Sequence, residues 1–496
     1  MDATPMEQTD PNASPALAHM RLTLDDAGFH KLAPAPPARA RHIHDQFLDT
    51  GDFAFARHGI TLRLRKAGRG ALFTLLHEDD ALDAPLPAMQ PDLSVFGPDW
   101  RESLTAISQD APLLIVAEAR TRRLTRDFDG GALALETGQL IANGQKHPFQ
   151  EAVLSTPPAL LAQTALKLTD MAGTRLQPEP PGRRAVRLAG GPRPAPLKST
   201  PALRDDPCLD EAVYRIVLAC LRQFRANLPA FFEGDEVGAV HQMRVAMRRL
   251  RSALGLFNRV LPTPEFLTLR EEAKRLASTM GEARNWDVFI AMLRAGPAAA
   301  FPAETGFAAL EAQCAVHRAA GYQLVRALLE DPATTRFLLT AEAFATRRGW
   351  RASLAAESLP RLAGPARLFG AESLNRLHRK LRKHGRHLAA LPAHERHLVR
   401  IELKKLRYAA EFFGPLFEPR GRVRQFNRAA AALQEELGKL NDMATAEGLA
   451  ARLNGGVPEA ARALGIVLGW TAHAALGEPR ALTAAWKEFQ AAKLFT

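Results

Sequence analysis

The sequence predicts an α+β protein with more than one domain, in which antiparallel strands precede a long all-helical region. The chain has 496 residues, enough for two to four domains at roughly 150 residues each. Its first third shows short alternating apolar segments between turn residues, and the rest shows apolar residues at three- and four-residue spacing. Hydrophobic residues make up 47% and charged residues 24%, which excludes a mainly disordered or fibrous chain.

The N-terminal region has the pattern of a sheet rich in hairpins. Residues 1–18 show no period, so we expect a flexible tail. Strand-like segments then recur at 19–24, 60–65, 72–76, 119–122 and 133–136. Turn residues such as Asn143-Gly144 separate them. The sequence therefore predicts an antiparallel sheet over 19–173, closed as a barrel or tunnel.

Composition changes between residues 174 and 200, where Pro and Gly crowd together and indicate a linker. The helical pattern covers 201–496, which is long enough for two bundles. It also contains a repeat: HQMRVAMRRLR from His241 recurs as HLVRIELKKLR from His397, 156 residues later. We expect the two repeats at about 201–295 and 370–450.

The net charge of +12 makes a polyanion the first partner to consider: nucleic acid, a phosphate polymer or an anionic membrane. The longest apolar stretches, 113–117 and 464–470, are too short to span a bilayer, so no membrane role is expected. The three cysteines form no CxxC pair, and the N-terminus has no signal-peptide pattern. We therefore expect a cytoplasmic protein.

The repeat carries a stripe of cations. On a helix, His241, Arg244, Arg248 and Arg251 fall along one margin of an apolar face, whereas Arg249 points away. The second copy has the same geometry, with Lys405 as the outlier and the margin formed by His397, Arg400, Lys404 and Arg407.

Guanidinium groups bind phosphate through paired donors, and a row of them one turn apart matches a repeating phosphate chain. A solvated helix face is the alternative, but such faces mix signs. Residues 374–407 hold eleven Lys or Arg and two Glu. Aromatic residues for stacking on bases are few, at 7%, which favours a ligand of phosphate without bases.

The two His-x-x-Arg-x-x-x-(Arg/Lys)-(Arg/Lys)-x-Arg copies, and the Gly-to-Asp segments that follow them, resemble the conserved-histidine α-helical (CHAD) family over about 201–496. The resemblance implies two bundles related by a pseudo-twofold axis, with a basic pore or groove that binds inorganic polyphosphate. It places Arg249 and Lys405 on this surface together with the two stripes. Plausible additions on the preceding helix are Arg379, Lys380, Arg382, Lys383 and Arg386.

In the N-terminal region, Arg63 and Arg65 share one face of a strand, and Arg120 and Arg122 share one face of another. The two pairs predict an anion site inside the barrel. An exposed sheet face is the alternative.

Segments 47–50, 59–65, 120–122 and 133–136 resemble a CYTH domain, the triphosphate tunnel fold, over about 19–170. The resemblance implies a Glu-x-Glu-x-Lys first strand whose acids hold Mg²⁺ or Mn²⁺. Here that stretch reads HMRLT from His19, so the acids and the lysine are missing. Glu136 and Glu151 are the remaining candidate metal ligands.

The leading prediction is therefore a cytoplasmic polyphosphate-binding protein, with polyphosphate granules as a candidate location and no cofactor needed for binding. Its tunnel domain would have lost catalysis. The first alternative is an active inorganic triphosphatase that uses Mg²⁺ or Mn²⁺. The second is a nonspecific nucleic-acid binder. The sequence predicts no oligomeric state.

Overall fold

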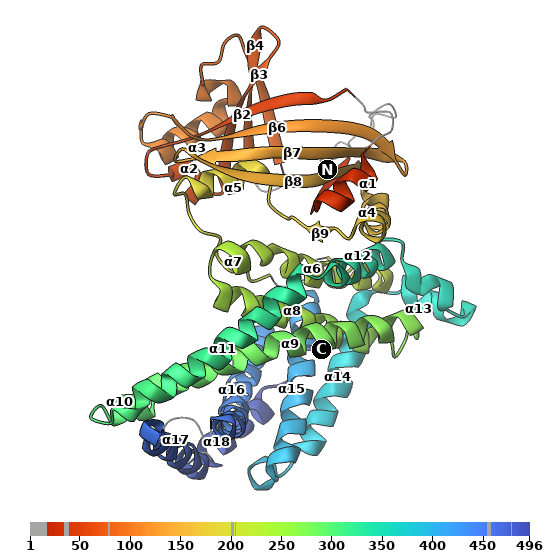
Figure 1. Cartoon of the computed structure of the whole chain (residues 1–496). Coiled ribbons are helices and arrows are strands. Elements are labelled where there is room, and N and C mark those ends of the chain that lie inside the picture. The colour runs from red at the N-terminus through yellow and green to blue at the C-terminus, as the bar shows by residue number, and fades with distance from the viewer. Residues whose placement is uncertain are drawn as a thin grey trace. The chain divides into compact units, whose positions relative to one another are not determined.

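Figure 1 shows the computed structural model of the chain, which describes residues 17–33, 39–77, 80–199, 203, 205–453, 458–477 and 479–496. The chain divides into two compact units, residues 1–194 and residues 195–496. Most of the tail expected over 1–18 lies outside the described residues. Ala18 already belongs to the first strand.

A nine-stranded antiparallel sheet forms the first unit, in the order β5-β4-β3-β2-β6-β7-β8-β1-β9. Its strands are β1 (Ala18–Thr23), β2 (Arg41–Asp49), β3 (Ile60–Ala67), β4 (Gly70–His77), β5 (Asp80–Leu86), β6 (Leu114–Phe128), β7 (Gly131–Ala142), β8 (Gln145–Thr156) and β9 (Arg175–Leu176). In the described part of the chain no strand pair joins β5 to β9, so hydrogen bonding does not close a barrel.

The long hairpins of this sheet turn at residues that tolerate positive φ. Asn143 and Gly144, between β7 and β8, have φ of 51° and 73°. This pair of angles is typical of a two-residue type I′ turn, whose twist matches the flanking strands. The turn sets the β7–β8 register, in which Glu136 lies directly opposite Glu151.

Helix α5 (Pro181–Leu188) packs on one face of the sheet, where Ala185 and Val186 are buried against Phe47. A Cβ atom at Gly182 would lie 2.6 Å from the Phe47 ring, so glycine permits this close approach. The expected linker over 174–200 therefore differs from the structure, since residues up to 194 belong to the first unit. Proline at the start of a helix is favourable, and the proline cluster here begins α5.

The other helical elements of the first unit are α1 (Asp26–Leu32), α2 (Ala54–Arg57), η1 (Leu93–Phe96), α3 (Pro98–Ser108) and α4 (Pro158–Ala172).

The second unit is all-helical (Figure 1). Its α-helices are α6 (Leu209–Ala226), α7 (Leu228–Glu233), α8 (Glu236–Phe257), α9 (Pro264–Ala295), α10 (Pro297–Ala300), α11 (Gly306–Glu330), α12 (Pro332–Thr346), α13 (Leu359–Ala363), α14 (Ala366–His384), α15 (Ala393–Phe413), α16 (Arg420–Arg452), α17 (Pro458–Gly477) and α18 (Pro479–Ala491). Short 3₁₀ turns join some of them: η2 (Gly349–Ser353), η3 (Ala356–Ser358), η4 (Leu388–Ala390) and η5 (Gly414–Leu416).

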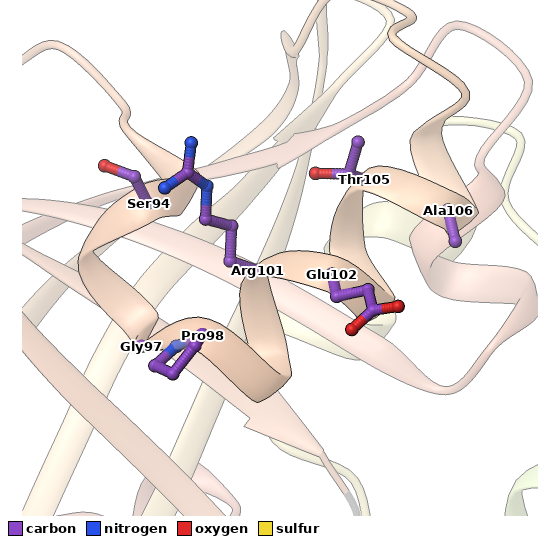
Figure 2. Close-up of a pocket in the computed structure, with 7 residues that line it drawn as sticks. All are labelled: Ser94, Gly97, Pro98, Arg101, Glu102, Thr105 and Ala106. Atoms are coloured by element: carbon purple, nitrogen blue, oxygen red, sulfur yellow. The ribbon is translucent and has the colours of Figure 1, made fainter.

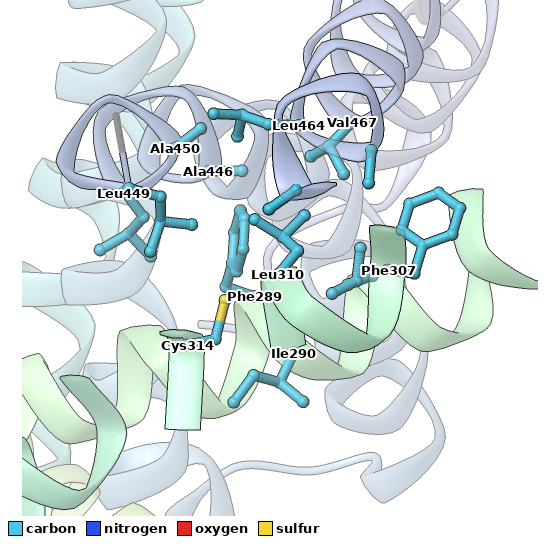
Figure 3. Close-up of a cluster of buried hydrophobic side chains, with 14 of the residues drawn as sticks. Phe289, Ile290, Phe307, Leu310, Cys314, Ala446, Leu449, Ala450, Leu464 and Val467 are labelled. Carbon is cyan, nitrogen blue, oxygen red and sulfur yellow. The ribbon is translucent and has the colours of Figure 1, made fainter. Parts of the chain in front are cut away.

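The helix order repeats along the second unit. Helix α9 begins at Pro264 and α16 begins at Arg420, 156 residues later, which is also the offset between the two sequence motifs. The motif helices themselves, α8 and α15, contact each other. A buried apolar cluster also joins the two halves, because α9 and α11 contribute Phe289 and Leu310 while α16 and α17 contribute Leu449 and Val467 (Figure 3).

Candidate functional site

Helix α8 holds the first cationic stripe at the edge of its buried face. The helix begins where the Asp235 side chain accepts a hydrogen bond from the Gly238 amide at 2.9 Å, which caps its first turn. Ala246, Leu250 and Leu254 are fully buried in the core. Helical spacing therefore holds the cationic side chains beside this core, at His241, Arg244, Arg248 and Arg251.

The two repeats meet at these side chains. Arg248 on α8 donates hydrogen bonds from Nε (3.1 Å) and Nη2 (2.8 Å) to the Tyr408 hydroxyl on α15. Burial and neighbouring charges lower the pKa of Arg244 to about 10, and Arg248, Arg400 and Arg284 are the cations that contribute. Arg400 belongs to the second motif, so cations from both motifs share one electrostatic neighbourhood.

His241 lies in the same neighbourhood. Burial lowers its pKa below the ordinary value, and the charges of Arg284, Arg248 and Arg244 lower it further. The cations of this site repel one another, which disfavours their charged forms. An anion that enters the site offsets this repulsion, so its binding is favourable. We call His241, Arg244, Arg248, Arg284 and Arg400 the central cluster.

Helix α9 supplies two arginines that the sequence analysis did not select. Arg284 lies beside His241, and Arg270 lies beside Arg251, whose pKa is lowered by burial and by the Arg270 charge. In the sequence, the only feature that pointed to Arg284 was its position after the segment Leu276–Gly281, which follows the first motif. Arg270 had none, because the packing of α9 on α8 brings it to the stripe.

Arg249 lies off the cationic stripe, as the helical period predicts, but it is not on the surface where the family resemblance placed it. Its side chain is 3% exposed and donates to Glu411 Oε2 at 3.0 and 2.8 Å. It also donates to the Ser199 carbonyl at 2.6 Å and to Gln223 Oε1 at 2.8 Å. The helical spacing turns Arg249 into the core, where it joins α8 to α15.

The second motif lies on α15. His397 and Lys405 are exposed, and the half-buried members of the motif are Arg400, Lys404 and Arg407. Lys405 lies near Lys380 of α14, whose Nζ is 2.7 Å from Glu402. The remaining predicted cations are exposed around the end of α14, at Arg379, Arg382, Lys383 and Arg386.

In the first unit, the carboxylates of Glu136 and Glu151 form ion pairs with arginines. Both carboxyls are 1% exposed, and Arg21 of β1 reaches both, at 2.9 and 3.2 Å. Arg123 of β6 also pairs with Glu136, and Arg184 of α5 pairs with Glu151. These guanidiniums occupy the oxygens that a divalent cation would need, so the two residues do not fit a metal site. Across the described ranges, no group of three or more His, Cys, Asp and Glu could hold a metal ion.

The four predicted tunnel arginines do not share a face of the sheet. Arg65 pairs across strands with Asp45, and Asp45 with Ala119, whereas Arg120 pairs with His44 on the opposite face. Arg65 is held by Asp45 at 2.5 and 2.8 Å, and Arg63 donates to Thr74 Oγ1 at 2.8 Å. Arg120 and Arg122 are exposed on the other face, so the predicted common anion site is wrong.

Figure 2 shows a pocket on η1 and α3 in which Arg101 and Glu102 are the charged residues. Its other lining residues are Ser94, Gly97, Pro98, Thr105 and Ala106. None of the residues predicted for the site lines it. Over the part of the chain that the structure describes, no helix is both long and apolar enough to cross a bilayer.

The comparison with family models matches the CHAD domain at residues 215–451, which includes both motif helices. Among solved structures, the CHAD domain of the plant Ricinus communis is 32% identical, with a TM-score of 0.53, over 61% of this chain and 99% of that chain. The chain belongs to the CHAD family. The CHAD region holds the complete central cluster.

Two more distant structures also match. PptA from Streptomyces chartreusis is 19% identical, with a TM-score of 0.42, over 57% of this chain and 99% of that chain. A putative adenylate cyclase from Bacillus halodurans is 14% identical, with a TM-score of 0.26, over 34% of this chain and 94% of that chain. The comparison with curated proteins found no match.

Proposed function

We propose that the CHAD domain binds inorganic polyphosphate through the central cluster. The observation that carries this proposal is the meeting of Arg244 and Arg248 with Arg400 and Tyr408 from the second repeat. A phosphate chain offers successive anionic oxygens, and each guanidinium can donate two parallel hydrogen bonds to such a group. The half-buried position of these cations strengthens their attraction to an anion relative to fully solvated side chains.

The aromatic residue beside the central cluster, Tyr408, favours a phosphate polymer over single-stranded nucleic acid. The Tyr408 side chain is 9% exposed, and its hydroxyl accepts from Arg248. Its ring therefore offers little surface for a base to stack on, whereas stacking platforms are the usual means of binding single strands. Duplex DNA remains a competitor to test, because its phosphates attract the same cations.

We further propose that the first unit is a CYTH-like domain without metal-dependent catalysis. The Arg21 pairs with Glu136 and Glu151 support this, since phosphoryl transfer depends on metal charge to offset charge in the transition state. The triphosphatase alternative would require a metal ion to displace Arg21. A phosphorus NMR time course of tripolyphosphate with the full chain and Mg²⁺ or Mn²⁺ tests it, because release of orthophosphate would contradict the proposal.

The binding proposal is tested with the double variant Arg244→Gln/Arg400→Gln and long-chain polyphosphate. The matched control is Arg275→Gln/Arg424→Gln, which also removes two charges. Arg275 and Arg424 are exposed, and Arg275 lies about 140° around α9 from Arg270. We expect the first variant to weaken binding at least tenfold and the control to change it less than twofold. Equal affinity of both variants would overturn the proposal, as would equal competition by duplex DNA at the same phosphate concentration.

A further inference from the structure

The repeat places equivalent positions on two sides of the central cluster, which we call its flanks. One flank contains Arg249 and the other contains Lys405, and the two flanks differ in charge. On one flank, Arg249 is buried and its charge is matched by Glu411. Its counterpart in the second repeat, 156 residues later, is Lys405, which is exposed. The residue of the first repeat that corresponds to Glu411 is Gly255. The acid that neutralises one flank is therefore missing from the other.

A cation stands close to the place of the missing acid. A Cβ atom at Gly255 would lie 3.5 Å from Cζ of Arg270. Arg270 Nε is buried and, among the described residues, has no hydrogen-bond partner. The residue that corresponds to Arg270 in the second repeat is Phe426, which is fully buried. Arg270 thus adds a charge to one flank that the other flank does not have.

The charges around Lys405 are predominantly positive. Arg251, Arg270 and Lys380 are its cationic neighbours, and Glu402 is its acidic neighbour. Glu402 already lies 2.7 Å from Lys380 and 3.0 Å from His384. On the opposite flank, by contrast, the Arg251 counterpart Arg407 lies 3.9 Å from Glu411. We call Arg251, Arg270 and Lys405 the cationic flank.

The cationic flank continues the stripe of the central cluster. Along α8, Arg251 follows Arg248, and from His241 to Arg251 the helix axis advances about 15 Å. Short anions fit within the central cluster, whereas a longer chain must extend beyond it. Extension past Arg249 and Glu411 meets a neutralised pair. Extension past Arg251 meets an excess of positive charge, since Glu271 beside Arg251 and Glu402 beside Lys405 are the acids there.

We propose that the cationic flank is a subsite for long phosphate chains, and that a bound chain leaves the central cluster on this side alone. This inference rests on the proposed function, because it assumes that the central cluster holds part of the same chain. Under this proposal, only chains long enough to extend beyond the central cluster contact the cationic flank, so the affinity depends on chain length. It also gives the pseudo-symmetric domain one preferred exit for its ligand.

The test compares tripolyphosphate with long-chain polyphosphate on the full chain, using Arg270→Gln/Lys405→Gln. We expect the affinity for long chains to fall about tenfold and the affinity for tripolyphosphate to change less than twofold. The salt dependence of long-chain binding should also become shallower, since fewer counterions are released. A loss of fold would instead weaken both ligands together. Arg275→Gln/Arg424→Gln serves again as the matched control.

In a variant whose circular dichroism and urea unfolding match those of the unaltered chain, an equal fall for both ligands, or no fall for long chains, would overturn the inference. So would a selective loss of long chains in Arg407→Gln as large as in Arg251→Gln. The central variant Arg244→Gln/Arg400→Gln distinguishes a failure of the proposed function from a failure of the inference about the cationic flank. If it binds both ligands as the unaltered chain does, the proposed function fails. If it weakens both ligands while the flank variant weakens neither, the inference about the flank alone fails.

Discussion

Arg248 and Tyr408 stand 160 residues apart in the sequence, yet two nitrogens of the Arg248 guanidinium donate to the Tyr408 hydroxyl, at 3.1 and 2.8 Å. The contact joins α8 of the first repeat to α15 of the second. It fixes the orientation of a cation that would otherwise sample several rotamers. The binding surface proposed above, built from two repeats, thus has a defined geometry before any anion arrives.

Removal of the Tyr408 hydroxyl should loosen this geometry. We expect Tyr408→Phe to lower the free energy of unfolding by about 1 kcal/mol, because it leaves half-buried donors of Arg248 without an acceptor. Affinity for tripolyphosphate should fall about threefold as Arg248 loses its fixed orientation. Urea unfolding and calorimetric titration measure the two effects. A gain in affinity would show instead that Tyr408 competes with phosphate for Arg248.

Gly281 of α9 lies against the Arg244 guanidinium, and a Cβ atom there would be 3.3 Å from Arg244 Nε. We expect Gly281→Ala to displace Arg244 and weaken polyphosphate binding about fivefold. Gly438 of α16 is the matched control, since a Cβ atom there meets nothing within 4 Å. Gly438→Ala should leave binding unchanged and stabilise its helix by up to about 1 kcal/mol. Equal binding by the two variants would contradict the role of this close approach.

His241 makes stability and binding depend on pH in opposite directions. Its pKa in the folded chain is below the ordinary value of 6.5, so below that pH the unfolded chain binds the proton more readily. Stability should therefore fall on acidification, and His241→Gln should reduce this fall in urea unfolding. A bound polyanion favours the protonated imidazole, so binding should strengthen as the pH falls toward the lowered pKa that His241 has in the free folded chain. An unchanged pH profile of binding in His241→Gln would assign the effect to other groups.

Arg21 should stabilise the first unit without any metal. We expect Arg21→Gln to lower the free energy of unfolding by roughly 3 kcal/mol, because it leaves two buried carboxyls with less positive charge. Hydrogen exchange of the backbone amides in β1, β7 and β8 measures the stability of the first unit within the full chain. Arg57→Gln is the control, since it removes an exposed ion pair and should lower the stability much less. Protection of these strands by Mg²⁺ in the unaltered chain would contradict the assignment of both carboxyls to arginine.

The position of the cationic stripe on α8 could be predicted because it depends on one helix alone, whereas its role in binding stays a prediction. His241, Arg244, Arg248 and Arg251 share a margin of α8 because the helical period is a local property of the sequence. The same period correctly set Arg249 apart, and the family resemblance then placed it on the surface, where the structure does not. Arg270 and Arg284 lie on another helix, so their proximity to the stripe depends on the packing of α9 against α8.

In the sheet, too, the pattern within one segment predicts local geometry but not the contacts between segments. Alternation along a strand correctly placed Arg63 with Arg65 and Arg120 with Arg122. The register of β2 with its neighbours then decides that the two pairs face opposite sides. A shift of one residue reverses every side chain, and nothing within a single strand records the register of its partner. The neighbour of Arg63 from β6 is accordingly Arg123.

Local sequence patterns were sufficient to predict the order of a strand region and a helical region, the duplicated motif and the spacing of its cations. These properties arise from contacts between residues close in the chain, for which the helix and strand periods are sufficient. Packing between distant segments was needed to show that Arg249 is neutralised by Glu411, that Arg270 lies near Lys405, and that Arg21 pairs with Glu136 and Glu151. Those pairings join distant segments, and they depend on which helices and strands pack together to bury the apolar surface.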